Sequence, residues 1–376
     1  MRNRILVPSL IVLMGIIFIY GLSVGVYKIF PYELLDSSLD AIKDEKTVEN
    51  NKFITQTNLD SLIRIDNESD IEQKRNNLIE FFYNVGSLDR VQYMSDLPEV
   101  EYGISDSNYN NLQNLNRIDK LTVEMDYGVN SISYLFIPEE SNQKLIFYHH
   151  GHDGDFLLGK HTIQFFLNRN FTVLAMTMPL VGMNNQPIVY IDGFGEIKLF
   201  SHNQFRLLET NNFNPMKFFI HPIQINLNFL ENEYDFKRYS IIGLSGGGWT
   251  AVVYSAIDDR ISDSISVASS IPFYLRVIER DIGDYEQTNI DLYKITNYLE
   301  LYVLSAYGDD GRKHIQIFNK NDPCCYSGDG YESYEFFIKD RLLQLGKGDF
   351  QIFMDDTHIE HKISDTVLEY IAKNID

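Results

Sequence analysis

Residues 239–257, YSIIGLSGGGWTAVVYSAI, decide the fold. The apolar run at residues 239–243 predicts a buried β-strand, and residues 249–257 predict a helix. Between them, GLSGG at residues 243–247 surrounds one serine with small residues, as a sharp turn from strand to helix requires. Such a turn presents the serine hydroxyl at the positively polarised N-terminus of the helix. The pattern therefore predicts that Ser245 is a nucleophile.

Strand-like and helix-like stretches alternate on both sides of this turn. Further strands are predicted at residues 120–125, 131–137, 144–148, 171–177, 262–269, 314–318 and 350–354, and further helices at residues 156–167, 218–236 and 366–375. Alternation of this kind predicts a largely parallel sheet with helices on both faces, and functional residues beyond the carboxyl ends of the strands. Residues 182–215 and 272–312 do not fit the alternation, and we expect them to form lid-like insertions.

The motif around Ser245 and this alternation resemble the α/β-hydrolase superfamily over about residues 119–376. The resemblance implies the α/β-hydrolase fold, with a mostly parallel central sheet flanked by helices. It also implies a Ser-His-Asp triad in which serine, acid and histidine follow one another along the chain. The acid would follow the second strand after the serine, and the histidine would follow the last strand. A triad of this kind needs no cofactor and no metal ion.

The acid and the histidine both have a favoured residue and an alternative. Asp322 lies just past a predicted strand and fits the position of the acid, with Asp329 as the alternative. His361 precedes the final predicted helix and resembles the family's catalytic base, although Glu360 stands where the family often has glycine. His358 lies nearer the end of the strand and remains an alternative base.

Backbone N–H groups that could stabilise an oxyanion are expected from two loops. Gly246 follows the nucleophile and would supply one of them. The segment HGHDG at residues 150–154 resembles the family's loop after the third strand. We assign the second N–H group to His152, with Gly151 as the less favoured alternative.

The same loop allows a second interpretation, in which it binds a metal ion. His149, His150, His152 and Asp153 are potential ligands. Neighbouring histidines point in different directions, however, and no carboxylate at helical spacing completes a site. We therefore expect no metal, and we expect His149 and His150 to hold the loop in shape by hydrogen bonding.

The chain has only two cysteines, Cys324 and Cys325, and they are adjacent. They exclude a long-range disulfide and a zinc site made of four cysteines. Two thiols and a disulfide between neighbours both remain open. In either state we expect the pair to shape the loop beside Asp322.

The N-terminal region predicts a membrane anchor. Residues 5–27 form a run of 23 residues without a charge, and a helix needs roughly 20 apolar residues to cross a membrane. Arg2 and Arg4 precede the run, which predicts a cytoplasmic N-terminus and a single-pass protein whose body is extracytoplasmic, either periplasmic or lumenal. A cleaved signal peptide is the alternative to this signal anchor.

Three regions are predicted along the chain, and its charge restricts the function of the body. Residues 1–29 would be the transmembrane anchor, residues 30–117 a stalk with a helical packing segment, and residues 118–376 the α/β-hydrolase domain. A net charge of −21 argues against nucleic-acid binding.

The favoured function is carboxylic-ester hydrolysis of a small-molecule, glycan or lipid ester. A serine peptidase on the same fold and a non-catalytic binding protein that retained the fold are the alternatives. The triad candidates, which stand in the family's order, argue against the non-catalytic alternative.

Overall fold

The computed structural model describes residues 13–15, 17–24, 57–88 and 97–375. The chain divides into two compact units, Met1–Gln56 and Thr57–Asp376. Within the first unit, the described residues are helical, and most of the predicted anchor at residues 5–27 lies outside them. Within the described parts of the chain, no helix combines the length and the apolar character needed to cross a membrane.

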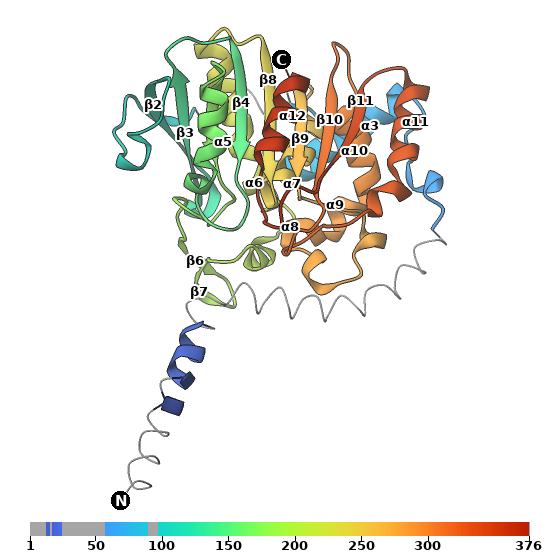
Figure 1. The fold of residues 1–376 in the computed structure, drawn as a ribbon. Helices are drawn as coiled ribbons and strands as arrows, with labels where there is room; N and C mark the ends of the chain where they lie inside the picture. The colour runs from blue at the N-terminus through green and yellow to red at the C-terminus, as the bar shows by residue number, and fades with distance from the viewer. Residues whose placement is uncertain (1–12, 16, 25–56, 89–96, 376) are drawn as a thin grey trace, which may run out of the picture. The chain divides into compact units, whose positions relative to one another are not determined.

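The second unit is built around one large sheet (Figure 1). The order of its nine strands is β1 (Glu99–Glu101), β2 (Leu115–Glu124), β3 (Asn130–Pro138), β5 (Thr172–Met176), β4 (Lys144–His149), β8 (Arg238–Leu244), β9 (Ile261–Val267), β10 (Lys313–Asn319) and β11 (Asp349–Asp355). The pairs from β1 to β5 are antiparallel, and every pair from β5 to β11 is parallel. The predicted α/β class with a mostly parallel sheet is therefore confirmed.

Helices cover both faces of this sheet. The longer ones are α3 (Glu68–Tyr83), α5 (Lys160–Leu167), α6 (Lys217–Glu233), α7 (Gly246–Ile257), α10 (Tyr298–Ala306), α11 (Glu335–Leu345) and α12 (Asp365–Ile375). In Figure 1, α5 and α12 lie in front of the sheet, while α7 lies behind it. Helices α10 and α3 both pack against α7.

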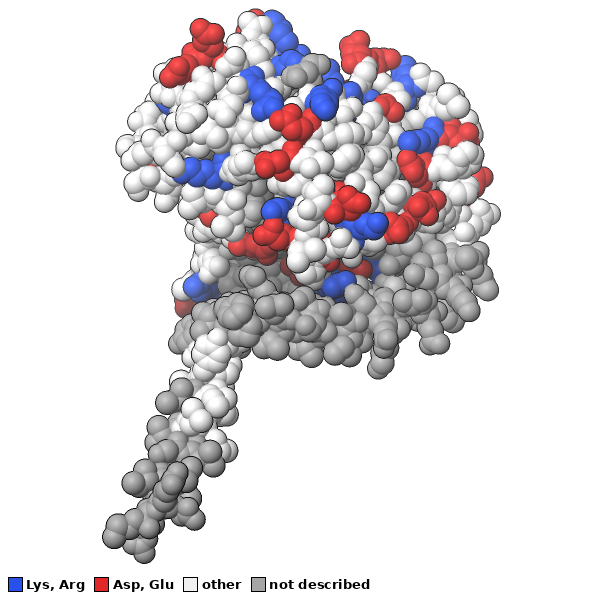
Figure 2. Space-filling model, in the orientation of Figure 1, with Lys and Arg blue, Asp and Glu red and all other residues white. Residues whose placement is uncertain are grey.

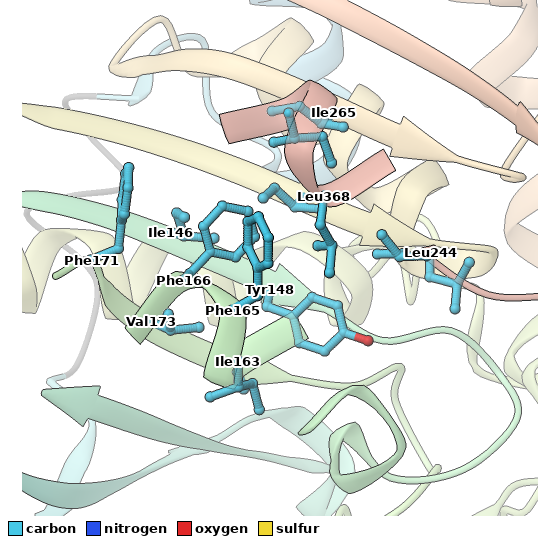
Figure 3. Packing of buried hydrophobic residues seen from close by; sticks show 14 of the residues in the cluster. Ile146, Tyr148, Ile163, Phe165, Phe166, Phe171, Val173, Leu244, Ile265 and Leu368 are labelled. Carbon is cyan, nitrogen blue, oxygen red and sulfur yellow. The ribbon is translucent and has the colours of Figure 1, made fainter. Parts of the chain in front are cut away.

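The core between the sheet and the α5–α12 layer is aromatic and aliphatic (Figure 3). Tyr148 and Ile146 of β4 meet Phe166 of α5 and Leu368 of α12, and all four are at most 1% exposed. At about 25 cal/mol per Å² of apolar surface, each such side chain contributes roughly 1.5–3 kcal/mol. This layer fixes the positions of the strand ends that carry the site.

Both predicted insertions have regular structure. Residues 182–215 contain the hairpin β6 (Ile188–Ile191) and β7 (Gly195–Lys198), then the 3-10 helix η6 (His202–Leu208). Residues 272–312 contain the 3-10 helices η7 (Phe273–Leu275) and η8 (Glu279–Asp281), then α8 (Tyr285–Thr288), α9 (Ile290–Ile295) and α10. The last of these is a core helix, because every one of its residues is buried.

The segment predicted as a stalk, residues 30–117, is described only in part. Residues 57–88 and 97–117 belong to the same compact unit as the sheet. The expected helix near Asp70 is α3, which begins after Asn67 with a capping box between Asn67 and Asp70. The predicted boundary near residue 118 falls inside β2, so the sheet begins earlier than its sequence indicates.

Charged side chains of both signs are interspersed on the face shown in Figure 2. One ion pair joins two of the helices that cover the sheet. Arg169 Nη2, just after α5, lies 2.7 Å from Glu369 Oε1 of α12. Exposed pairs of this kind contribute about 0–1 kcal/mol each, so the apolar core remains the main source of stability.

Candidate active site

Ser245 lies in the turn between β8 and α7, as the sequence predicts. Its backbone is held at φ 56° and ψ −126°, a conformation that a residue with a side chain rarely adopts. Two hydrogen bonds fix this turn: the Ser245 N–H group donates to the Val267 carbonyl at 2.9 Å, and the Gly248 N–H group donates to the Ser245 carbonyl at 2.9 Å. The strain is therefore maintained by β9 and by the first turn of α7.

Two glycines allow the neighbouring loop to approach this serine. A Cβ atom on Gly151 would lie 2.7 Å from the Ser245 Cβ atom, and one on Gly246 would lie 2.3 Å from His152 Cε1. A side chain at residue 151 would also meet the Leu244 carbonyl oxygen at 2.8 Å, and one at residue 246 would displace the His152 ring. The loop after β4 consequently lies directly against the serine.

Asp322 and His361 are brought into contact by the turns after β10 and β11. The distance from Asp322 Oδ2 to His361 Nδ1 is 2.7 Å, and Asp322 is 3% exposed. The carboxylate also accepts the Cys324 N–H group at 2.8 Å. Because Nδ1 donates to the carboxylate, His361 Nε2 carries the lone pair. Nε2 is buried and has no hydrogen-bond partner among the described residues.

Asn319 connects these two turns, and the sequence analysis did not single it out. Its Nδ2 atom lies 3.2 Å from Asp322 Oδ2 and 2.9 Å from the Lys362 carbonyl oxygen. An asparagine at the end of a predicted strand gives no signal of such a role. Its partners become neighbours only when β10 and β11 pair in parallel.

His358, the alternative base, faces another carboxylate. Its Nε2 atom lies 3.1 Å from Asp355 Oδ2, and its Nδ1 atom accepts the Glu360 N–H group at 3.1 Å. Burial raises the pKa of Asp355, but hydrogen bonds from Ser364 and Thr357 outweigh burial and lower the pKa overall. In the structure, His358 therefore contacts Asp355 and does not contact Asp322.

Asp329, the alternative acid, lies just before the 3-10 helix η9 (Gly330–Ser333). Among the described residues it pairs with no histidine. The structure thus brings together Asp322 and His361, and it separates Asp329 from both histidines.

The loop at residues 150–154 is held against the ends of β4 and β5. Thr177 Oγ1 lies 3.2 Å from the Gly151 carbonyl oxygen and 2.8 Å from that of Gly154. The two backbone N–H groups assigned to an oxyanion hole, those of Gly246 and His152, donate to no other described group. Both remain available to a ligand beside Ser245.

His149 and His150 make local hydrogen bonds. His149 Nδ1 donates to the His150 carbonyl at 2.9 Å, and His150 Nδ1 lies 2.9 Å from the hydroxyl of Tyr148. Burial lowers the pKa of each imidazole to about 4. In the described structure they do not converge with His152 and Asp153 on one point, as the metal interpretation of this loop would require.

The imidazole of His152 instead meets side chains from the two insertions. Its Nε2 atom lies 3.1 Å from His202 Nδ1, 3.1 Å from Glu286 Oε1 and 3.5 Å from Asp284 Oδ2. Burial alone would lower the pKa of His152, but Glu286 and Asp284 outweigh burial and raise the pKa overall. The sequence analysis missed His202, Asp284 and Glu286, since their spacing from His152 carries no local signal.

A cavity of about 340 Å³ is lined by His361 and by Leu244, the residue before Ser245. Its lining includes Tyr148, His150, Leu158, Leu244 and His361. It combines apolar side chains such as Leu158 and Ile363 with polar ones, among them the imidazole of the Asp322–His361 pair. A pocket of this composition can hold a small organic group.

Cys324 and Cys325 are joined by a disulfide between neighbours. The pair directly follows the turn that holds Asp322. Of the two states that the sequence left open, two thiols or a disulfide, the structure has the disulfide.

The order and direction of the strands, with a strained serine after β8, define an α/β-hydrolase-like fold. Neither a protein-family model nor a curated protein sequence matches the chain. Solved structures do. Acetyl xylan esterase 1 from Thermoanaerobacterium sp. JW/SL YS485 is similar over 84% of this chain and 96% of its own, with a TM-score of 0.54 and 15% identity.

Two further solved structures have the same fold. An acetyl xylan esterase from Paenibacillus sp. R4 is similar over 84% of this chain and 97% of its own, with a TM-score of 0.53 and 14% identity. A protein described as methylesterase BT1017 is similar over 87% of this chain and 67% of its own, with a TM-score of 0.53 and 12% identity. At such identities the similarity establishes the fold alone.

Proposed function

We propose that the chain is a serine hydrolase that cleaves carboxylic esters through Ser245, His361 and Asp322. The observation that carries the proposal is the buried Asp322–His361 hydrogen bond of 2.7 Å at the same sheet edge as the strained Ser245. His361 and Leu244, the neighbour of Ser245, line one cavity. A carboxylate, an imidazole and a serine in this order are typical of acyl transfer.

In the proposed mechanism, Ser245 Oγ attacks the acyl carbon while His361 Nε2 takes the hydroxyl proton. His361 then gives this proton to the departing alkoxide, which leaves as an alcohol. Water attacks the acyl-enzyme with the same imidazole as base, and the acid and free Ser245 are released. Asp322 fixes the imidazole with Nδ1 protonated and stabilises its cationic form.

The carbonyl oxygen becomes negatively charged during both attacks. The N–H groups of Gly246 and His152 are proposed to receive this charge, because neither is engaged by another described group. Gly246 also opens α7, so the partial positive charge of the helix N-terminus adds to the stabilisation.

Two observations favour an ester over a peptide. The two acetyl xylan esterases and the methylesterase that share this fold are all named as esterases. The cavity of about 340 Å³ fits a small acyl or alkoxy group better than a peptide segment. We therefore propose a small-molecule or glycan ester as the substrate.

Covalent labelling of the full-length chain with a fluorophosphonate probe tests the nucleophile. We expect the wild-type chain to be labelled and Ser245→Ala to be unlabelled, with unchanged far-ultraviolet circular dichroism. The matched control is Ser107→Ala, which removes the hydroxyl of an exposed serine and should keep wild-type labelling. Ester turnover should fall by about 10⁴-fold or more in Ser245→Ala.

Three outcomes would contradict this proposal. Labelling that persists in Ser245→Ala would place the nucleophile elsewhere. A folded wild-type chain that resists the probe and hydrolyses no acetyl or methyl ester would favour a binding protein. Cleavage of peptide anilides in preference to esters would favour the peptidase alternative.

We further propose that residues 5–27 anchor the chain and that the body is extracytoplasmic. The absence of charge over 23 residues and the preceding Arg2 and Arg4 support this topology. Large apolar side chains on the described helical residues are exposed, among them Leu13, Met14, Ile17, Phe18, Ile19 and Leu22. A protease added to spheroplasts, or to vesicles that expose the non-cytoplasmic face of the membrane, should digest the body, and protection of the body there would overturn the topology.

A further inference from the structure

We propose that His152, His202, Asp284 and Glu286 form a binding site for one zinc ion. One nitrogen or oxygen atom from each residue can be chosen so that all four atoms lie within 4.8 Å of one another. The residues come from three separate segments: the loop after β4, the first residue of η6, and the start of α8 with the residue before it. The inference does not rest on the proposed hydrolysis.

The distances within the group match those between zinc ligands. His152 Nε2 lies 3.1 Å from His202 Nδ1 and 3.5 Å from Asp284 Oδ2. Glu286 Oε1 lies 3.1 Å from His152 Nε2, and Glu286 Oε2 lies 3.3 Å from His202 Nδ1. Tetrahedral zinc with bonds of about 2.0–2.2 Å separates its ligand atoms by about 3.3–3.6 Å. The 4.0 Å between His202 Nδ1 and Asp284 Oδ2 is longer and needs an inward movement, and Asp284 is partly exposed.

The buried carboxylate of Glu286 indicates that a cation could bind here. Its side chain is fully buried, and neither of its oxygens makes a hydrogen bond of acceptable geometry with a described group. The nearby imidazole nitrogens lie in short contact with these oxygens without donating properly to them. A buried carboxylate whose nearest partners are two poorly aligned imidazoles is costly, and a metal ion held between these side chains would compensate for its burial.

The tautomer of His202 also supports metal binding. Its Nε2 atom lies 2.7 Å from the Pro179 carbonyl oxygen, which can only accept, so Nε2 carries a proton. In the neutral imidazole, Nδ1 then presents its lone pair to His152 and Glu286. Donation of the second ring N–H group to a backbone carbonyl is the usual arrangement around a metal-bound histidine.

The types of ligand atom indicate which metal ion would bind. Two imidazole nitrogens and two carboxylate oxygens suit zinc, which is most often bound by four ligands of this kind. Calcium and magnesium prefer sites made of oxygen ligands alone. We therefore commit to Zn²⁺.

A zinc ion here would connect the serine loop to both insertions. The His152 ring packs against Gly246, whereas His202 and Glu286 belong to the segments at residues 182–215 and 272–312. The four side chains are thus positioning residues, which fix the loop beside Ser245. Sequence analysis predicted no metal, because only His152 of this group lies in a recognisable motif.

The test is the zinc content and stability of the purified full-length chain. After incubation with Zn²⁺ and removal of the unbound metal, we expect one zinc per chain by mass spectrometry. Glu286→Gln and His202→Asn should each weaken zinc binding at least tenfold, by analogy with the effect of disturbing metal-site residues. Zinc should raise the Tm of the wild-type chain and leave that of both variants unchanged. Co²⁺ should give the intense visible absorption of a tetrahedral site in the wild type alone.

His161→Ala is the matched control, because it removes an exposed imidazole that pairs with Asp365. It should bind zinc as the wild type does. Absence of stoichiometric zinc from the folded wild-type chain would overturn the proposal. Zinc that is retained in Glu286→Gln and His202→Asn, but lost from Cys324→Ser, would place the metal at the cysteines and His361 and would also overturn it.

Discussion

His361 and His358 follow the same strand, yet they face different carboxylates. The Nε2 atoms of both histidines lack a hydrogen bond to a described group, but that of His358 lies 3.1 Å from Asp355 Oδ2, whereas Asp322 contacts only the Nδ1 atom of His361. A general base needs an unoccupied nitrogen that can accept the serine proton. At the scale of single residues, the pairing of each imidazole therefore distinguishes two candidates that the sequence left open.

We expect His361→Ala to lower kcat by about 10⁴-fold or more, because it removes the proposed base. His358→Ala should lower kcat by less than about tenfold and should destabilise the fold by about 1–2 kcal/mol, since it removes a partner of buried Asp355. Steady-state kinetics on one ester and thermal unfolding of both variants measure the two effects. The reverse ranking of the kcat values would transfer the role of base to His358.

The sequence predicts the position of Ser245 in a strand-to-helix turn better than it predicts the contacts between the candidate site residues. Ser245 is indicated because its small neighbours are themselves a local signal. The zinc ligands give no such signal: His152 and Glu286 are separated by more than a hundred residues and meet only through folded insertions. Long-range contacts between polar side chains leave no periodicity in the chain.

At the scale of secondary structure elements, one buried arginine connects the ends of several elements. Arg312 Nε donates to the Ile261 carbonyl of β9 at 2.9 Å, and its Nη1 atom donates to the Tyr307 carbonyl after α10 at 2.5 Å. Its Nη2 atom donates to the Asp258 carbonyl after α7 at 3.2 Å. Cations are favourable at helix C-termini, where carbonyl groups have no partner within the helix.

We expect Arg312→Met to lower the free energy of unfolding by about 3–5 kcal/mol, because it removes a buried guanidinium that donates to carbonyl groups of several elements. Lys320→Met, which removes an exposed positive charge after β10, is the control and should change stability by less than about 0.5 kcal/mol. Urea denaturation followed by circular dichroism measures both. Equal effects would show that Arg312 contributes no more than a surface charge.

Helices and strands can be predicted from sequence periodicity where one face is buried and the other is exposed. They are harder to predict where every side chain is buried. Helix α12 alternates buried and exposed residues in the helical period, and its prediction agrees with the structure to within one residue at its start. Helix α10 was not predicted, because all its residues are buried and its sequence has no polar face. Strand β1 was missed as well, since three residues of largely polar sequence give too short a pattern.

At the scale of the whole second unit, the buried histidine His314 contributes to the pH dependence of stability. His314 lies fully buried between β9 and β10, 2.9 Å from Ser264 Oγ and 3.3 Å from Ser266 Oγ. Burial lowers the pKa of its imidazole to about 3. In the unfolded chain the pKa of histidine is about 6.5, so between pH 6.5 and 3 the unfolded state binds the proton and the folded state does not.

The contribution of His314 to stability is therefore complete above about pH 6.5 and is lost as the pH falls. From pH 7 to pH 5, His314 alone should cost about 2 kcal/mol. We expect His314→Gln, which cannot be protonated in this range, to lose about 2 kcal/mol less than the wild type between these two pH values. Chemical denaturation at pH 7 and pH 5 measures this difference. Parallel losses in the two proteins would show that His314 is protonated in the folded state.

The topology of the sheet was predictable because it repeats one simple unit. Parallel strands joined by helices place their carboxyl ends at one edge, so the alternation of the sequence already located Ser245, Asp322 and His361 at that edge. The antiparallel pairs among β1, β2, β3 and β5 were not predicted, because strand direction depends on connections whose geometry the sequence does not display.

Helix α12 is the last element of the chain, yet it covers the core built by β4 and α5. Translation proceeds from the N-terminus, so α12 cannot fold on a ribosome-bound chain until residues 365–375 have left the exit tunnel. Until then Ile146, Phe166 and their neighbours have an incomplete cover, and the nascent unit remains loosely packed. The β4–α5 core is therefore completed by a segment that is translated after every strand of the sheet.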